Sequence, residues 1–91
     1  MVQDELYLKT LNEHFGVDFT QCESSNIFAY AFSKKKAQLY VAFKNRKIYS
    51  YSPVPEAIFA NLVTAESKGK FINQNLVKGD YTVTKYEIQE S

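Results

Sequence analysis

The chain has 91 residues, of which 45% are apolar, and its formal net charge is +1. This length provides enough residues for one hydrophobic core and too few for two, so we expect a single domain over residues 1–91. Seven Tyr and seven Phe beside only three Gly and two Pro exclude a disordered chain, and the small net charge argues against a protein that binds nucleic acid through bulk charge alone.

The first predicted element is a helix over residues 4–15. Its apolar side chains recur at helical spacing, at Tyr7, Leu8, Leu11 and Phe15. Gly16 is well placed to end this helix, because glycine readily adopts the left-handed conformation of a helix C-terminus. The pattern therefore predicts one N-terminal helix with a single buried stripe.

Three antiparallel strands are predicted next, over residues 27–33, 37–44 and 47–51. The first is rich in aromatic and β-branched residues and ends at the polar turn Ser33–Lys36. The second alternates, so that one face carries Leu39, Val41 and Phe43. A tight hairpin joins the second strand to the third, which gives a three-stranded β-meander.

A second helix is predicted from Pro55 to about Ala65. Proline suits the first turn of a helix, and the following apolar stripe is expected to face the sheet: Val54, Ile58, Phe59, Leu62 and Val63. A short helical turn over residues 70–76 is expected to dock Phe71, Ile72 and Leu76, and residues 81–88 have the composition of a strand. The fold class is thus α+β, with a C-terminal extended segment or strand.

The second face of so small a sheet also has to be covered. The second helix can cover one face, so the other requires the first helix, the C-terminal tail, a second copy of the chain or a ligand. We therefore keep a homo-oligomer as one possibility.

Several short motifs occur in an order and spacing that resemble the KTSC domain family. They are Ser24-Ser25-Asn26-Ile27, Leu39-x-Val41-x-Phe43, Tyr49-Ser50-Tyr51 with Val54-Pro55, and Ala65-x-Ser67-Lys68-Gly69-Lys70-Phe71-Ile72-Asn73. The resemblance covers residues 24–77, with an N-terminal helical extension over 1–23 and a C-terminal extension over 78–91. The family is named for the C-terminal region of some lysyl-tRNA synthetases and also occurs as small bacterial and phage proteins. The resemblance implies a domain of unestablished role, with RNA binding suggested by the synthetase association.

Catalytic chemistry is not expected of this chain. Acid–base and nucleophilic catalysis usually recruit His, Cys or paired carboxylates, whereas here His14 and Cys22 are each single and the carboxylates lie mainly near the two ends of the sequence. The three glycines are isolated, so there is no phosphate-binding loop, and no metal or cofactor site is expected. We predict a protein that is not an enzyme.

The sequence also predicts a cytoplasmic protein. No apolar run approaches the roughly 18 residues that cross a membrane, and the N-terminal segment carries acids where a signal peptide would carry bases. The single cysteine cannot form an internal disulfide, which favours a reducing compartment. No contact with a membrane is expected.

Tyr49 and Tyr51 share a face of the third strand, and the hairpin loop decides which face that is. A two-residue loop, Asn45-Arg46, would place both tyrosines opposite the Leu39 face, where they could stack nucleobases. A three-residue loop, Lys44 to Arg46, with the third residue left-handed, would pair Val41 with Tyr49 and turn both tyrosines into the core. The family's usual glycine at position 46 favours the second loop, while the arginine found here opposes it at a cost of about 1 kcal/mol.

Charge is segregated along the chain. Residues 1–23 have a net charge of −4, and residues 24–55 carry six cations and no acid. Solvated turns commonly carry such residues, but two basic turns at opposite ends of the middle strand could also follow a single-stranded backbone laid across the sheet. The predicted nucleic-acid-binding residues are Lys34, Lys35, Lys36, Lys44, Arg46, Lys47, Tyr49, Tyr51, Lys68 and Lys70.

We therefore expect a non-catalytic binding module for single-stranded RNA or DNA. The alternative is a protein–protein interaction module, for example a small phage-like modulator of a host protein machine. The acidic N-terminal segment beside the basic middle suits a complementary protein surface as well as it suits phosphates. The partner's identity does not follow from the sequence.

Overall fold

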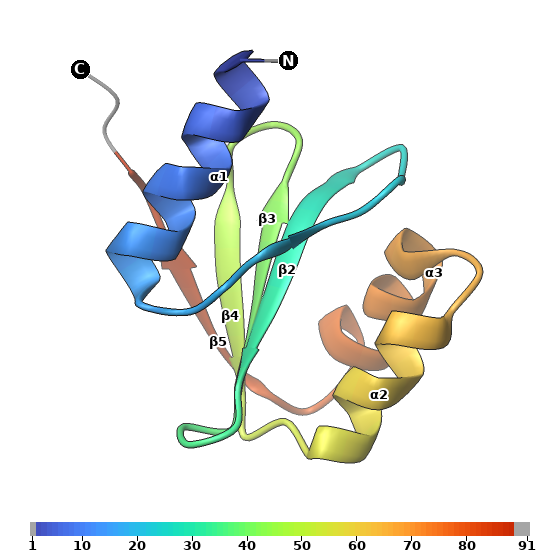
Figure 1. The fold of residues 1–91 in the computed structure, drawn as a ribbon. Coiled ribbons are helices and arrows are strands. Elements are labelled where there is room, and N and C mark those ends of the chain that lie inside the picture. Colours follow the sequence, from blue (N-terminus) through green and yellow to red (C-terminus); the bar gives the residue numbers. More distant parts are fainter. Residues whose placement is uncertain (1, 89–91) are drawn as a thin grey trace.

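A computed structural model describes residues 2–88, and in it a five-stranded antiparallel sheet lies between two helical layers (Figure 1). The strands follow one another in chain order across the sheet. The helices are α1 (Val2–Phe15), α2 (Glu56–Thr64), α3 (Lys68–Ile72) and the π-helical turn η1 (Asn73–Val77). The strands are β1 (Thr20–Gln21), β2 (Ile27–Ser33), β3 (Gln38–Phe43), β4 (Ile48–Ser52) and β5 (Thr82–Tyr86).

Helix α1 covers one face of the sheet (Figure 1). Tyr7 and Leu11 of its apolar stripe are buried against the strands, whose residues on this face include Ala29, Ala31 and Ala42. These alanines leave room for the large side chains of the helix, so helix and sheet approach closely. The sequence left open what covers the second face of the sheet. The chain's own helix α1 covers it, so a second copy is not needed to bury it.

The opposite face packs against α2, α3 and η1. Ile27, Leu39, Val41 and Tyr51 of the sheet form a second core. The helices contribute the fully buried Leu62, Ile72 and Leu76. Val63 lies outside this core at 44% exposure, contrary to expectation, because it is rotated about 100° from Leu62 around the helix.

The sheet has five strands, so the prediction of three is wrong in number. At one edge, β1 pairs with β2 through only two residues, both exposed, and so leaves no apolar alternation to detect. At the other edge, β5 pairs with β4 from Ile48↔Tyr86 to Ser52↔Thr82. The composition of residues 81–88 predicts a strand. Its pairing with β4 could not be predicted, because β4 lies far away in the sequence and no local pattern indicates the pairing.

The hairpin between β3 and β4 has the three-residue loop. Arg46 is left-handed at φ 71°, and its backbone N–H donates to the Phe43 carbonyl at 3.0 Å. The Phe43 N–H donates to the Lys47 carbonyl at 2.8 Å and so closes the loop. The resulting register pairs Val41 with Tyr49 and Leu39 with Tyr51. The alternative that turns the tyrosines toward the core is therefore the correct one.

Gly16 ends α1 in the left-handed conformation, as expected. Its φ is +68°, and its N–H donates to the Asn12 carbonyl at 2.9 Å. Gly16→Ala is expected to lower the free energy of unfolding by about 1 kcal/mol, because a Cβ disfavours this conformation. Urea unfolding would measure the change. Gly16→Asn should restore part of the loss, and equal stability of all three chains would contradict the explanation.

Candidate nucleic-acid interface

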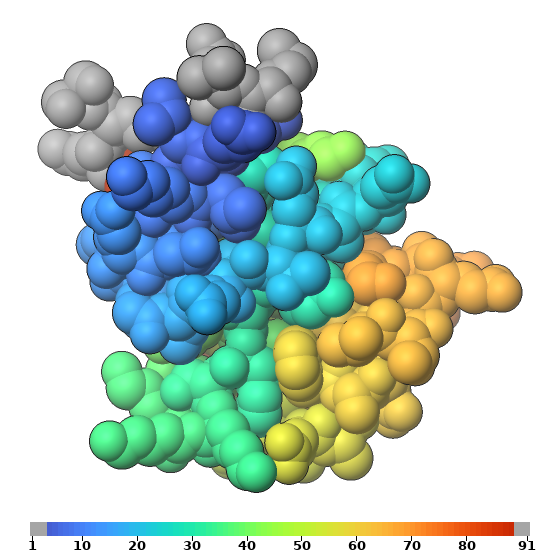
Figure 2. Space-filling model, viewed as in Figure 1, coloured from blue at the N-terminus to red at the C-terminus, as the bar shows by residue number. Residues whose placement is uncertain are grey.

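The two predicted basic turns lie at opposite ends of the sheet. Lys34–Lys36 form the β2–β3 turn, while Lys44, Arg46 and Lys47 lie in the β3–β4 turn, and all six side chains are exposed. The six residues of β3 separate the turns by about 20 Å at ~3.3 Å per residue. In Figure 2, the β2–β3 turn lies at the bottom of the molecule and the β3–β4 turn at the top.

A single strand cannot lie across the sheet between these turns, because helices cover both faces (Figure 1). That part of the predicted binding path is wrong. The Lys34 ammonium also lies 3.8 Å from the Glu56 carboxylate, where both side chains are largely exposed. The β2–β3 turn is therefore a separate basic surface with an acid beside it.

The two predicted tyrosines differ in accessibility. Tyr51 is 3% exposed and belongs to the second core, so its ring face is closed to a ligand. Burial raises the pKa of Tyr51, and the neighbouring Tyr49 adds to that rise, so the hydroxyl stays neutral. Tyr49 is only half-buried. Of the pair, Tyr49 alone offers surface for stacking.

Tyr49 belongs to an aromatic and basic surface beside the β3–β4 turn. Its ring meets the half-buried Phe43 edge to face, with centroids 5.7 Å apart. Lys85 is its direct cross-strand neighbour, and the alternation of β4 places Lys47 on the same face. We call Phe43, Lys47, Tyr49 and Lys85 the turn patch. Neither Phe43 nor Lys85 was predicted as a site residue, because the hairpin register decides the place of Phe43 and the pairing of β5 decides that of Lys85.

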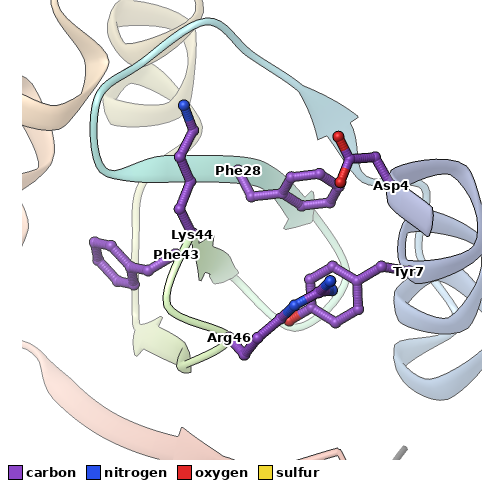
Figure 3. Close-up of a pocket in the computed structure, with 6 residues that line it drawn as sticks. All are labelled: Asp4, Tyr7, Phe28, Phe43, Lys44 and Arg46. Atoms are coloured by element: carbon purple, nitrogen blue, oxygen red, sulfur yellow. The ribbon is translucent and has the colours of Figure 1, made fainter. Parts of the chain in front are cut away.

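A pocket of about 240 Å³ lies on the other side of the same turn (Figure 3). The residues that line it are Asp4, Tyr7, Phe28, Phe43, Lys44 and Arg46. The guanidinium carbon of Arg46 lies 3.9 Å from the centroid of the Tyr7 ring, and the Tyr7 and Phe28 centroids are 5.2 Å apart. Two cations, one acid and the rings of Tyr7 and Phe28 therefore lie around one hollow.

Figure 3 shows how the pocket residues are arranged. Phe28 lies between Asp4, which comes from α1, and Lys44, which comes from the turn. The Phe43 ring points away from the hollow (Figure 3) and meets Tyr49 edge to face. Asp4, Tyr7 and Phe28 were not predicted as site residues, because no local pattern shows that the first turns of α1 reach the β3–β4 turn.

The structure places Lys68 and Lys70 in the first turn of α3 and not in either basic turn of the sheet. The Lys68 ammonium donates to the Ala65 carbonyl at 3.2 Å, and the Ser67 hydroxyl accepts from the Lys70 N–H at 3.3 Å. Gly69 lies within α3, and α2 already ends at Thr64. A Cβ at Gly69 would lie 3.4 Å from the Ser24 hydroxyl, so this segment packs on the loop before β2.

Cys22 lies near two of the predicted cations. Burial raises the pKa of its thiol, and Lys68 and Lys44 oppose that rise only in part. The thiol is therefore protonated at neutral pH, which is its less nucleophilic form.

His14 packs edge to face on Phe15, with ring centroids 4.7 Å apart. Within residues 2–88, no three His, Cys, Asp or Glu side chains group as metal ligands would.

In the part of the chain that the structure describes, every helix is too short or too polar to cross a membrane.

Comparison with known proteins identifies relatives of the central part of the chain. The sequence profile of the KTSC domain matches residues 23–81. A KTSC domain protein from Yersinia pestis, known from its crystal structure, is similar at 27% sequence identity with a TM-score of 0.70. The similarity covers 77% of this chain and 97% of that protein. No protein of curated function matches.

Proposed function

We propose that this chain, which belongs to the KTSC domain family, is a non-catalytic module that binds single-stranded RNA or DNA at the β3–β4 turn. The proposal narrows the predicted surface to one end of the sheet. The observation that carries it is the turn patch, where the half-buried Tyr49 and Phe43 lie beside Lys47 and Lys85.

Single-stranded nucleic acids are bound by this combination of groups. Lysine and arginine contact phosphates, and aromatic rings stack on the bases with little sequence preference. At this turn, Lys44, Arg46 and Lys47 are all exposed within four consecutive residues. Phosphates would contact the turn while a base stacks on the accessible part of Tyr49. Tyr51 is buried and takes no part in this arrangement.

Fluorescence anisotropy with a labelled oligo-dT or oligo-U strand tests the proposal. Native protein is expected to bind at low salt, and Tyr49→Ala to bind about tenfold more weakly, because stacking contributes about 1–3 kcal/mol per base. Tyr49→Phe retains the ring and serves as the matched control, with near-native affinity. Failure of the native chain to bind either strand at low salt would refute the proposal.

A protein-interaction module is the second candidate, and the exposed edge of the sheet favours it. Among residues 2–88, strand β5 pairs on one side only, with β4. Val83 on β5 is 50% exposed and Val77 on η1 is 54% exposed. Exposed apolar side chains and a strand edge open to pairing are both features that protein partners use.

A pull-down from native lysate, with one half treated with nuclease, separates the two functions. Loss of the captured partners after nuclease treatment supports nucleic-acid binding. A protein retained in stoichiometric amount after that treatment supports the interaction module. A second copy of the chain would be recognised in the same experiment by its mass.

A further inference from the structure

We infer that a second copy of this chain pairs with the open edge of β5, with Lys85 of each copy opposite Glu87 of the other. The two strands run antiparallel, so the sheets of the two copies join into one continuous sheet. This inference does not depend on single-strand binding. It names the partner that the second candidate function leaves open.

The edge of the sheet at β5 is accessible along most of the strand (Figure 1). Thr82, Val83, Thr84 and Lys85 are all exposed, and their side chains alternate between the two faces of the sheet. Neither helical layer therefore covers these residues. At the opposite edge, β1 has only two residues, so β5 offers the longer set of backbone groups to a new strand.

The hydrogen bonds of the β3–β4 hairpin determine which backbone groups of β5 face the open edge. The Phe43 N–H donates to the Lys47 carbonyl, and hydrogen-bonded pairs alternate along an antiparallel ladder, so the odd-numbered residues of β4 bond to β3. The even-numbered residues of β4 bond to β5, and their partners there are even-numbered too. The N–H and C=O groups of Val83, Lys85 and, by the same alternation, Glu87 thus point to the open edge.

The strand-like alternation continues to residue 88, beyond the last residue of β5. Tyr86 and Ile88 both pack against the core beneath α1, as residues two apart in an extended segment do. Lys85 and Glu87 therefore lie on the other face, and both are exposed. An acid and a base, two residues apart on one face, are thus available at the edge.

Charge selects one register for two antiparallel copies of this strand. Outward-facing residues have to meet outward-facing residues, so odd-numbered positions pair with odd-numbered positions. Pairing Lys85 with Lys85 would oppose like charges, and pairing it with Val83 would leave its charge unmatched. Pairing it with Glu87 sets opposite charges against each other twice, once on each side of the two-fold axis. The net charge of +1 adds little repulsion between the copies.

Sedimentation velocity over increasing protein concentration tests the inference. One short strand buries little area, so we expect a weak dimer that forms as the concentration approaches about 1 mM. Glu87→Lys sets lysine against lysine at both contacts and should raise the dimer Kd more than about tenfold. Glu66→Lys is the matched control, because it makes the same charge change at an exposed residue between α2 and α3. It should leave the Kd within about twofold, since a charge beyond one Debye length is largely screened.

An equimolar mixture of two variants tests the register itself. Lys85→Glu alone should weaken the dimer as Glu87→Lys does, but a mixture of the two chains sets acid against lysine at every contact and should dimerise at least as well as the native chain. Native protein that stays monomeric up to about 1 mM overturns the inference, and leaves single-strand binding and other protein partners open. Dimers that persist undiminished in both single variants, or a mixture that stays monomeric, overturn pairing of Lys85 with Glu87.

Discussion

Replacing Leu11 with alanine is expected to lower the free energy of unfolding by about 3 kcal/mol. Leu11 is 0% exposed and packs in the core between α1 and the sheet. Removing a buried leucine loses its transfer free energy and leaves a cavity, which together cost about 2–5 kcal/mol. Urea unfolding followed by circular dichroism would measure the loss.

Leu6→Ala is the matched control, because Leu6 lies on the same helix at 59% exposure. It should change stability by no more than about 0.5 kcal/mol. Helix α1 precedes the residues that match the family, 23–81, so the comparison also asks whether this extension belongs to the folded unit. Equal effects of the two substitutions would show that α1 is not part of the core.

The local elements of this fold could be predicted because each shows a regular spacing of apolar residues or a residue type that ends it. The first helix shows a 3.6-residue stripe and ends at Gly16, and β3 shows period-two alternation. The partners of the edge strands could not be predicted. Strand β1 has only two residues, and β5 pairs with a strand about 35 residues earlier in the chain, so the pairings depend on tertiary contacts.

The candidate site also has a part that local sequence predicts and a part that only tertiary contacts determine. The exposed cations were predictable, because hydrophilic turns between apolar strands stay in solvent. The accessibility of the tyrosines depended on the conformation of Arg46, whose left-handed φ of 71° sets the register of the hairpin. The pocket could not be predicted, because it forms only when α1 packs beside the β3–β4 turn.

Removing the three cations of the β3–β4 turn is expected to weaken single-strand binding by about 100-fold at 50 mM salt. The variant is Lys44→Gln, Arg46→Gln and Lys47→Gln. Each phosphate contact to a single strand contributes about −0.7 to the slope of log affinity against log salt, so losing three should reduce the slope by about 2 in magnitude. Anisotropy titrations at four salt concentrations would measure both quantities.

The opposite turn provides a control with the same change in net charge. Lys34→Gln, Lys35→Gln and Lys36→Gln also removes three positive charges, but from a turn about 20 Å away along β3. If long-range attraction alone drove binding, the two triple variants would lose the same affinity for the single strand. Local phosphate contacts at the β3–β4 turn should leave the Lys34–Lys36 variant within about threefold of the native chain, because charges beyond one Debye length are largely screened. Equal losses, or a larger loss at Lys34–Lys36, would contradict binding at the β3–β4 turn, provided that thermal unfolding shows both variants to be folded.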